Sequence, residues 1–448
     1  MNRLSAVRRL VFNEPYLQQV REMTSSDAER WRVWLDSTGD MPDSQGSYAY
    51  LQKRFDSFDD FCRLVELFQV TAVERHANRR WTSRFLYPYG PDLLYADLDG
   101  SSARLGSNDR RFFARGGELL YLMLNRSSRG AELSERLEKV LMDPDTRWNR
   151  AVRALIPPVR EPGSDRLTGI KIGYLPHRHL PQYEQIAEDW LAVLQLDVPG
   201  EALLDPLVRV TGLNLVLYLL ERAHAVAGEA TKPRLLLEIA GPRRGSVLDL
   251  AQQSFEANRD APALALAAYL GRARRTSEWA DVTQQPNAGV AALDFLKHRF
   301  CWRPDRGFMP DSSADRVFQV MRTDAEKRHH QHFRNILPTW SRQIGLAMAR
   351  RGVGTWYAPD DAFLKAIVLV TVGQHEELRI FLEKLYRRYG IVIGPIEAEQ
   401  AFGSLPTDFQ ELDANQTRLE MRLRALGLLE RLSDDCAYVR NPFRGRRR

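Results

Sequence analysis

The sequence predicts a mainly α, multidomain protein that ends in a C-terminal winged helix-turn-helix. Three observations support this fold class. The chain has 448 residues, which is enough for two to four domains. Apolar residues recur at helical spacing in many segments, such as FDDFCRLVELFQV and QYEQIAEDWLAVLQL. Residues from about 375 to 443 follow the order helix, strand, helix, helix, strand, turn, strand, which is that of a winged helix.

Composition places the chain among ordinary globular proteins. Hydrophobic residues make up 44% and charged residues 27%, so a disordered chain is not expected. The net charge of +6 is a weak sign of polyanion partners. The basic residues are mostly arginine, for which codon usage in a GC-rich genome is the favoured explanation. Cys62, Cys301 and Cys436 form no CxxC pair, and no apolar run approaches the roughly 20 residues that span a bilayer. We expect a cytoplasmic protein without a membrane partner.

Three domains are expected along the chain. The segment IPPVREPGSDRLT (156–168) is rich in proline and charge, which is typical of a linker. It separates a mostly helical N-terminal domain, residues 1–156, from a central helical domain, residues 169–340. A change of pattern near residue 340 begins the C-terminal region, residues 341–448.

The central and C-terminal regions contain a few predicted strands. RLLLEIAG (234–241) is typical of a buried strand, and VLDLAQQSFEAN and APALALAAYLGRARR after it predict two helices. IGLAMARRGVGTWYAP predicts two short strands joined by a glycine-containing turn. Asp360 and Asp361 open the next helix, which is strongly apolar.

The elements of the expected winged helix begin at residue 378. Apolar residues at helical spacing predict a helix over 378–389, ended by Gly390. The run 391–393 predicts a short strand, and Pro395 starts a short helix. LLERL and CAYVR around residues 433–435 predict a hairpin. The longer helix before that hairpin is expected to bury one face, made of Phe409, Leu412, Leu419, Leu423 and Leu426.

The opposite face of that helix is the candidate recognition surface for double-stranded DNA. At 100° per residue it carries Gln410, Thr417, Arg418, Met421 and Arg424. Glutamine and arginine read base edges, and arginine and threonine hold phosphates. The basic tail, with Arg444, Arg446, Arg447 and Arg448, would add non-specific phosphate contacts.

Two features of the same segment favour a protein partner instead. Asp434 and Asp435 at the tip of the hairpin would repel a DNA backbone, and an outward Met421 suits a protein surface as well as a groove. The alternative is therefore a scaffold whose winged helix docks other subunits.

A weak anion site is also predicted. Arg243, Arg244 and Ser246 follow a strand and precede a helix, which is an arrangement that can bind phosphate. The segment lacks the lysine of a phosphate-binding loop, so nucleotide hydrolysis is not supported. A plain turn with Ser246 as the helix N-cap is the simpler interpretation.

No metal, cofactor or catalytic site is predicted. His329, His330 and His332, like His177 and His179, lack completing ligands, and the first group also suits a phosphate-facing basic patch. A metal-dependent nuclease stays open as an alternative. Glu238 lies on a strand candidate, but Ala240 occupies the position where such a site has lysine. Whether the protein is an enzyme is left open, and a non-enzymatic role is favoured.

One resemblance adds to this interpretation. The segments RRYGIVIGP (387–395) and LRALGLLERLSDDCAYVRNPF (423–443) resemble the ends of large helical proteins from bacterial anti-phage defence islands. Those proteins accompany DNA phosphorothioation-dependent or methylation-associated restriction systems. The resemblance implies an accessory subunit that acts beside separate enzymes in a defence or restriction complex. The resulting hypothesis is a non-enzymatic DNA-binding or adaptor subunit.

Overall fold

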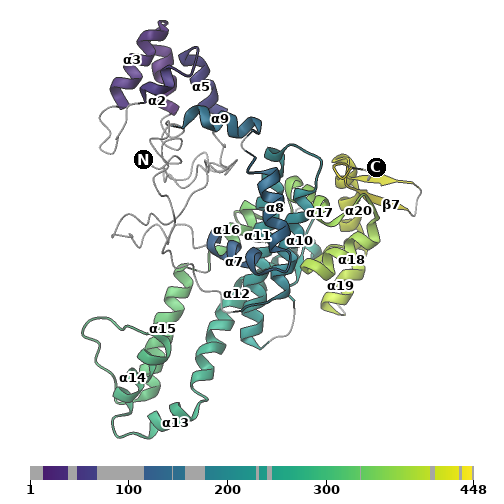
Figure 1. Ribbon diagram of the computed structural model, residues 1–448. Helices are drawn as coiled ribbons and strands as arrows, with labels where there is room; N and C mark the ends of the chain where they lie inside the picture. Colours follow the sequence, from purple (N-terminus) through teal and green to yellow (C-terminus); the bar gives the residue numbers. More distant parts are fainter. Residues whose placement is uncertain are drawn as a thin grey trace. The chain divides into compact units, whose positions relative to one another are not determined.

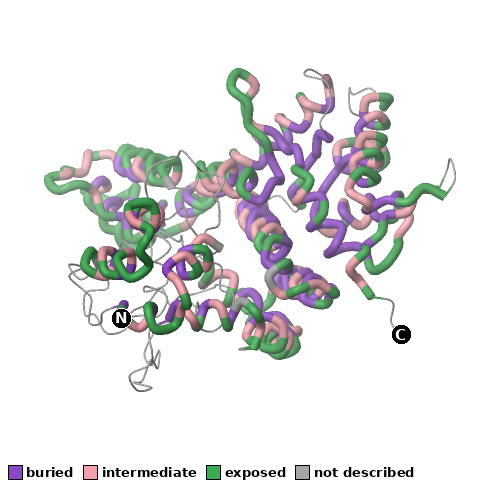
Figure 2. Tube along the Cα trace, turned by 90° about the horizontal axis from the view of Figure 1, so that it is seen from above, coloured by how far each residue is buried: buried purple, intermediate pink, exposed green. Residues whose placement is uncertain are grey.

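The computed structural model of the chain is mainly helical (Figure 1). It describes residues 14–38, 48–67, 116–143, 145–156, 177–228, 232–239, 245–332, 334–403, 409–432 and 436–445. The expected linker at 156–168 therefore lies outside the described residues, apart from Ile156. The chain divides into two compact units, residues 1–180 with 199–204 and residues 181–198 with 205–448. Figure 2 shows buried and exposed stretches alternating along most helices, as expected when one face of each helix packs.

Part of the first unit packs around an aromatic core. Trp31 stacks on Phe61 with ring centroids 5.2 Å apart, and Trp34 packs against both Phe58 and Phe61. Such ring pairs combine large buried area with favourable edge geometry. The helices of this unit are α2 (Glu14–Met23), α3 (Asp27–Thr38), α4 (Ala49–Gln52), α5 (Phe58–Leu67), α7 (Gly116–Arg126), α8 (Gly130–Val140), α9 (Arg147–Leu155) and the 3-10 helix η3 (Gly200–Leu203).

The second unit holds the longer helices and all the described strands. Its helices are α10 (Pro181–Leu194), α11 (Leu204–Ala227), α12 (Ser246–Ala273), α13 (Ser277–Gln284), α14 (Ala288–Phe300), α15 (Ala314–His332), α16 (Ile336–Gln343), α17 (Asp361–Thr371), α18 (Leu378–Tyr389), α19 (Pro395–Phe402) and α20 (Phe409–Ala425). Its largest apolar core joins α11 and α12 to α17, α18 and α20. This core therefore spans both sides of the boundary expected near residue 340.

The helices α13, α14 and α15 gather around the last turns of α12 with a core of their own (Figure 1). We expected two helices where α12 is continuous. Pro262 lies inside it and removes one backbone hydrogen bond. Ala261 and Ala265, on either side of the proline, are both buried in the main core. Packing on both sides of Pro262 is thus the reason that one helix continues through a residue that ordinarily ends one.

Three small sheets form in the second unit. β2 (Ala347–Arg350) and β3 (Gly354–Tyr357) make the predicted antiparallel hairpin. β1 (Leu235–Leu236) pairs in parallel with β5 (Ile391–Val392). The third sheet has the order β4-β7-β6, with β4 (His375–Glu377), β6 (Leu429–Arg431) and β7 (Ala437–Arg440) all antiparallel.

Most of the C-terminal elements form as predicted. α18 ends at Gly390, which has a φ of 68°. α19 begins at Pro395, and β6 and β7 pair as a hairpin whose tip, including Asp434 and Asp435, lies outside the described residues.

One strand was not predicted, and one side chain was wrongly placed. His375–Glu377 forms β4, because its backbone pairs with β7. Phe409, expected on the buried face of α20, is 55% exposed, because the helix meets the core only from Leu412 onward.

The side chain of Asn415 joins α20 to both parallel strands. Its Oδ1 accepts a hydrogen bond from the backbone N–H of Ile239 at 2.8 Å. Its Nδ2 donates to the carbonyls of Leu237 and Ile393 at 2.9 and 3.0 Å. Asn415 is fully buried, so no water can replace these bonds. One amide thus satisfies three backbone groups that would otherwise be left without partners.

We expect Asn415→Asp to lower the free energy of unfolding by about 3 kcal/mol, because a carboxylate cannot donate to the two carbonyls and would be buried without a counter-charge. Chemical denaturation measures this change. Asp413→Asn, on the exposed side of the same helix, is the control and should change stability by less than about 0.5 kcal/mol. Equal effects of the two substitutions would contradict the role given to Asn415.

Candidate nucleic-acid interface and charged groove

α20 buries one face and exposes the other. Leu412, Asn415, Leu419 and Leu423 are buried on the core side. Gln410, Thr417 and Arg424, three of the residues predicted for the recognition surface, are exposed on the opposite side. Met421, between Thr417 and Arg424, is 60% exposed. The Thr417 hydroxyl donates to the carbonyl of Asp413, so its lone pairs still face solvent.

Arg418 is less available than sequence spacing predicts. It is half-buried, and its charge acts on Glu411, two turns earlier in α20. Hydrogen bonds from Ser246 hold the pKa of the Glu411 carboxyl below its usual range, and Arg418 acts in the same direction. Arg424 is therefore the more accessible of the two arginines.

The predicted anion site at the start of α12 holds a carboxylate from the same chain. The backbone N–H and the hydroxyl of Ser246 both donate to Oε2 of Glu411, at 2.8 and 2.7 Å. Gly245 occupies the N-cap position, and Ser246 is the first residue of the helix. The N-terminus of a helix favours negative charge, and here Glu411 supplies it. Arg243 and Arg244 lie outside the described residues.

The basic tail is only partly described. Arg444 is half-buried, so it does not extend freely into solvent, and Arg446, Arg447 and Arg448 lie outside the described residues. The preceding residue, Phe443, is anchored because its carbonyl accepts from the backbone N–H of Asp197 at 2.7 Å.

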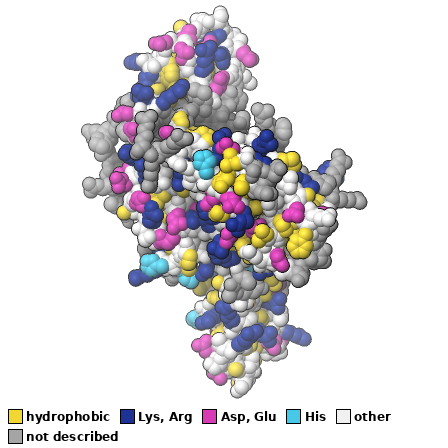
Figure 3. Space-filling model, turned by 90° about the vertical axis from the view of Figure 1, so that its right-hand side faces the viewer, with side chains coloured by type: hydrophobic (Ala, Val, Ile, Leu, Met, Phe, Trp, Pro, Cys, Tyr) yellow, Lys and Arg dark blue, Asp and Glu magenta, His cyan; other side chains and the backbone are white. Residues whose placement is uncertain are grey.

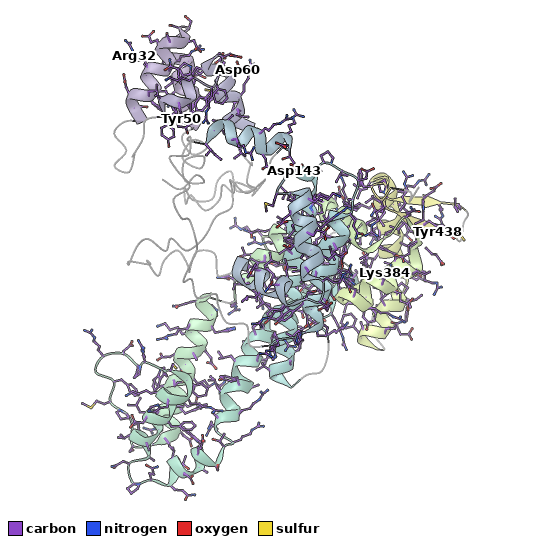
Figure 4. The ribbon with its side chains drawn as sticks, in the orientation of Figure 1. Arg32, Tyr50, Asp60, Asp143, Lys384 and Tyr438 are labelled. Carbon is purple, nitrogen blue, oxygen red and sulfur yellow. The ribbon has the colours of Figure 1, made fainter. Side chains whose placement is uncertain are left out.

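The surroundings of α20 are mixed in charge and polarity. Asp413 and Glu430 are exposed acidic residues near the candidate surface. Leu432, beside the hairpin tip, is 68% exposed. Figure 4 labels Tyr438 on β7, the central strand of the sheet that follows α20. The prediction of the recognition face from helical spacing did not include Asp413 or Glu430.

A second polar feature is a groove of about 660 Å³ lined by α10, α17 and α18. Figure 3 views the side of the molecule on which α18 to α20 lie, and shows acidic and basic side chains interleaved across its middle. Lys384, labelled in Figure 4, donates to Oε1 of Glu376 and to the carbonyl of Thr371. Arg387 pairs with Glu383 one turn away.

Arg388 connects this groove to the buried interior. Its Nε and Nη2 donate to Oδ1 of Asp189 at 3.1 and 2.6 Å, and its Nη1 donates to Glu188 at 2.9 Å. Asp189 is almost fully buried and also accepts from Asn214 and from the hydroxyl of Tyr389. Burial raises the pKa of the Asp189 carboxyl, while the Arg388 guanidinium acts in the opposite direction.

The charges that line the groove are matched within the chain. Lys384, Arg387 and Arg388 each pair with a carboxylate. The groove therefore ties α10 and α18 together and presents little unpaired charge to a ligand. Sequence reasoning missed Asp189 and Arg388 because they are 199 residues apart and belong to no motif.

The candidate metal ligands are not brought together in the part of the chain that the structure describes. No group of three or more His, Cys, Asp or Glu side chains there is placed to hold a metal ion. His330 contacts the Arg334 guanidinium, and His177 and His179 are exposed in a loop. Glu238 accepts from the Trp356 indole at 3.3 Å.

Within the same described ranges, every helix is too short or too polar to cross a bilayer. Comparison with known proteins gives no match to a protein-family model, a curated protein or a solved structure.

We expect Arg388→Met to lower the free energy of unfolding by about 3–5 kcal/mol, because it leaves the Asp189 carboxylate buried without its counter-charge. The double variant Asp189→Asn/Arg388→Met removes both charges and should recover most of that loss. A double-mutant cycle by chemical denaturation measures the coupling. Additive losses would show that the two side chains do not act as a pair.

The free energy of unfolding of the Arg388→Met variant should also depend more steeply on pH than that of the wild type. Losing the guanidinium raises the pKa of Asp189 further above its ordinary value of 3.8. A carboxyl whose folded-state pKa is raised makes the folded protein bind the proton more tightly, so stability falls as pH rises from the unfolded pKa through the folded pKa. The deficit of the variant should be smaller at pH 5 than at pH 8. A deficit independent of pH would contradict this origin.

Proposed function

We propose that the C-terminal part of this chain is a winged helix-turn-helix that binds double-stranded DNA through α20. The observation that carries the proposal is the amphipathic placement of this helix. One face is fixed in the core by Leu412, Asn415 and Leu419, and the other presents Gln410, Thr417 and Arg424 to solvent immediately before a β-hairpin.

The order and pairing of the elements support the winged-helix assignment. In that fold the recognition helix precedes the two strands of the wing, as α20 precedes β6 and β7. A third strand completes the sheet on the far side of β7, and here it is β4. β4 precedes α18, whereas the strand predicted for this role, β5, pairs with β1.

The chemistry of the exposed face suits a DNA groove. Arg424 can donate two hydrogen bonds to guanine, and Gln410 can pair with the edge of adenine. Thr417 is short enough to contact phosphate or a thymine methyl group. Exposed Arg431 and Arg440 on the hairpin strands would add phosphate contacts beside the groove.

A second candidate function is docking of a protein partner on the same surface. Met421 and Leu432 are 60% and 68% exposed and would be buried by such a partner. Asp413 and Glu430 also weaken attraction to DNA. This function predicts association that is insensitive to salt and negligible affinity for DNA.

The wider role that we propose is that of a non-enzymatic, cytoplasmic subunit of a larger complex. The resemblance of segments 387–395 and 423–443 to accessory proteins of anti-phage restriction systems supports it. In this role the protein would direct separate enzymes to DNA or hold them together.

The test reverses two charges on α20. Arg418→Glu/Arg424→Glu should weaken binding to a labelled duplex in fluorescence anisotropy. It should also make log affinity fall less steeply with log salt, because positive charge is lost from the side of α20 that would face the DNA. Most of the effect should come from Arg424, which is the more exposed residue.

The matched control is Arg32→Glu/Arg63→Glu, which makes the same change in charge on helices α3 and α5. Their side chains are 70% and 66% exposed, so folding should be preserved. Equal DNA affinity in the α20 variant and the wild type would refute the recognition-helix proposal. Equal weakening in both variants would mean that net charge, and not α20, governs binding.

A further inference from the structure

One long continuous segment of the chain contains basic residues and no acidic ones. Residues 327–359, KRHHQHFRNILPTWSRQIGLAMARRGVGTWYAP, contain six Lys and Arg residues and no Asp or Glu. The whole chain has 64 Lys and Arg against 58 Asp and Glu, so the residues outside this segment carry 58 of each. The excess of six basic residues in this segment thus equals the net charge of the whole chain.

All six basic side chains of the segment are exposed. They are Lys327 and Arg328 near the end of α15, Arg334 after it, Arg342 on α16, and Arg350 and Arg351 at the turn of the β2–β3 hairpin. Among the described residues, none of the six forms an ion pair. Arg334 contacts His330, and Arg342 donates to the carbonyl of Pro338, so both keep their full charge.

In the first part of α15, by contrast, exposed arginines form ion pairs. There Arg316 pairs with Asp311 at 3.1 Å and Arg322 with Glu326 at 2.7 Å. The pairing stops after Glu326, on the same helix and at similar exposure. Charges without counter-charges repel one another and cost stability, so an acid-free segment of this length, with all its basic side chains exposed, points to a polyanionic partner.

The backbone beneath these charges is held in place. Asp360 accepts from the N–H of Phe363 to cap α17, and its own N–H donates to the carbonyl of Gly345, between α16 and β2. Gly345 has a φ of 79° and leaves no room for a side chain beside Asp360. At the hairpin turn, Gln252 of α12 donates to the carbonyl of Val353. The arginines therefore project from a preorganised frame.

We propose that residues 327–351 form a second DNA contact, which binds the phosphate backbone of a duplex through the end of α15, α16 and the Arg350–Arg351 turn. This inference rests on the proposed function for the identity of the polyanion. Gln331, Asn335 and Gln343 are exposed polar side chains of the same segment, and each can donate to phosphate oxygens. Phosphates of a duplex are evenly spaced anions, which suits basic residues distributed over three elements.

The test compares two double variants that remove the same charge. Arg350→Gln/Arg351→Gln removes the unpaired arginines of the turn. The control, Arg316→Gln/Arg322→Gln, removes two exposed arginines that are already paired. Anisotropy with two duplexes of unrelated sequence is measured across a salt series. The turn variant should lower the log–log salt slope by about 2 with both duplexes, and the control should change it by much less.

The experiments distinguish the contact proposed for residues 327–351 from the one proposed for α20. One outcome is that Arg350→Gln/Arg351→Gln keeps the wild-type slope of log affinity against log salt, while Arg418→Glu/Arg424→Glu weakens binding. This outcome would overturn the inference about residues 327–351 and would still support α20 as the recognition helix. The opposite outcome is a reduced salt slope in the turn variant with wild-type binding in the α20 variant. It would support the phosphate contact of residues 327–351 and refute the proposal that α20 is a recognition helix. A wild-type protein that binds neither duplex at low salt would overturn both.

Discussion

The fold around the candidate interface depends on one buried amide. Asn415 lies on the inner face of α20 and bonds to backbone groups that follow both parallel strands. Those strands are more than 150 residues apart in sequence, at Leu235–Leu236 and Ile391–Val392. Because a buried amide must satisfy its donors and its acceptor together, α20 can rotate very little about its own axis. The orientation of its outer face toward solvent follows from that restraint.

The local elements of the C-terminal region were predictable because their signals are local. Proline at the start of α19, glycine at the end of α18 and apolar spacing along α20 each act within a few residues. Which strands pair with one another was not predictable in the same way. The strand at 391–393 could have joined the hairpin, but it pairs with β1, and His375–Glu377 takes the edge of β7 instead. These choices depend on contacts between distant segments, which spacing alone does not encode.

The candidate site was predictable to a similar extent. Helical periodicity placed Gln410, Thr417 and Arg424 on the solvent side, where they lie. It could not show that Arg418 interacts with Glu411, or that Glu411 fills the anion site at Ser246, since both contacts depend on how α12 and α20 meet. The charge imbalance of residues 327–359 is visible in the sequence. Its significance depends on structure, because only there are the arginines seen to be exposed and to form no ion pair with any residue that the structure describes.

Three exposed methionines allow a direct test of the proposed DNA contact. Met421 lies on α20, Met348 on β2 and Met309 in the loop before α15, with exposures of 60%, 53% and 87%. Oxidation by peroxide, followed by mass spectrometry, measures the accessibility of each. If α20 is the recognition helix, saturating duplex DNA will slow oxidation of Met421 and leave Met309 unchanged. Oxidation of Met421 at the same rate with and without bound DNA would contradict the central claim.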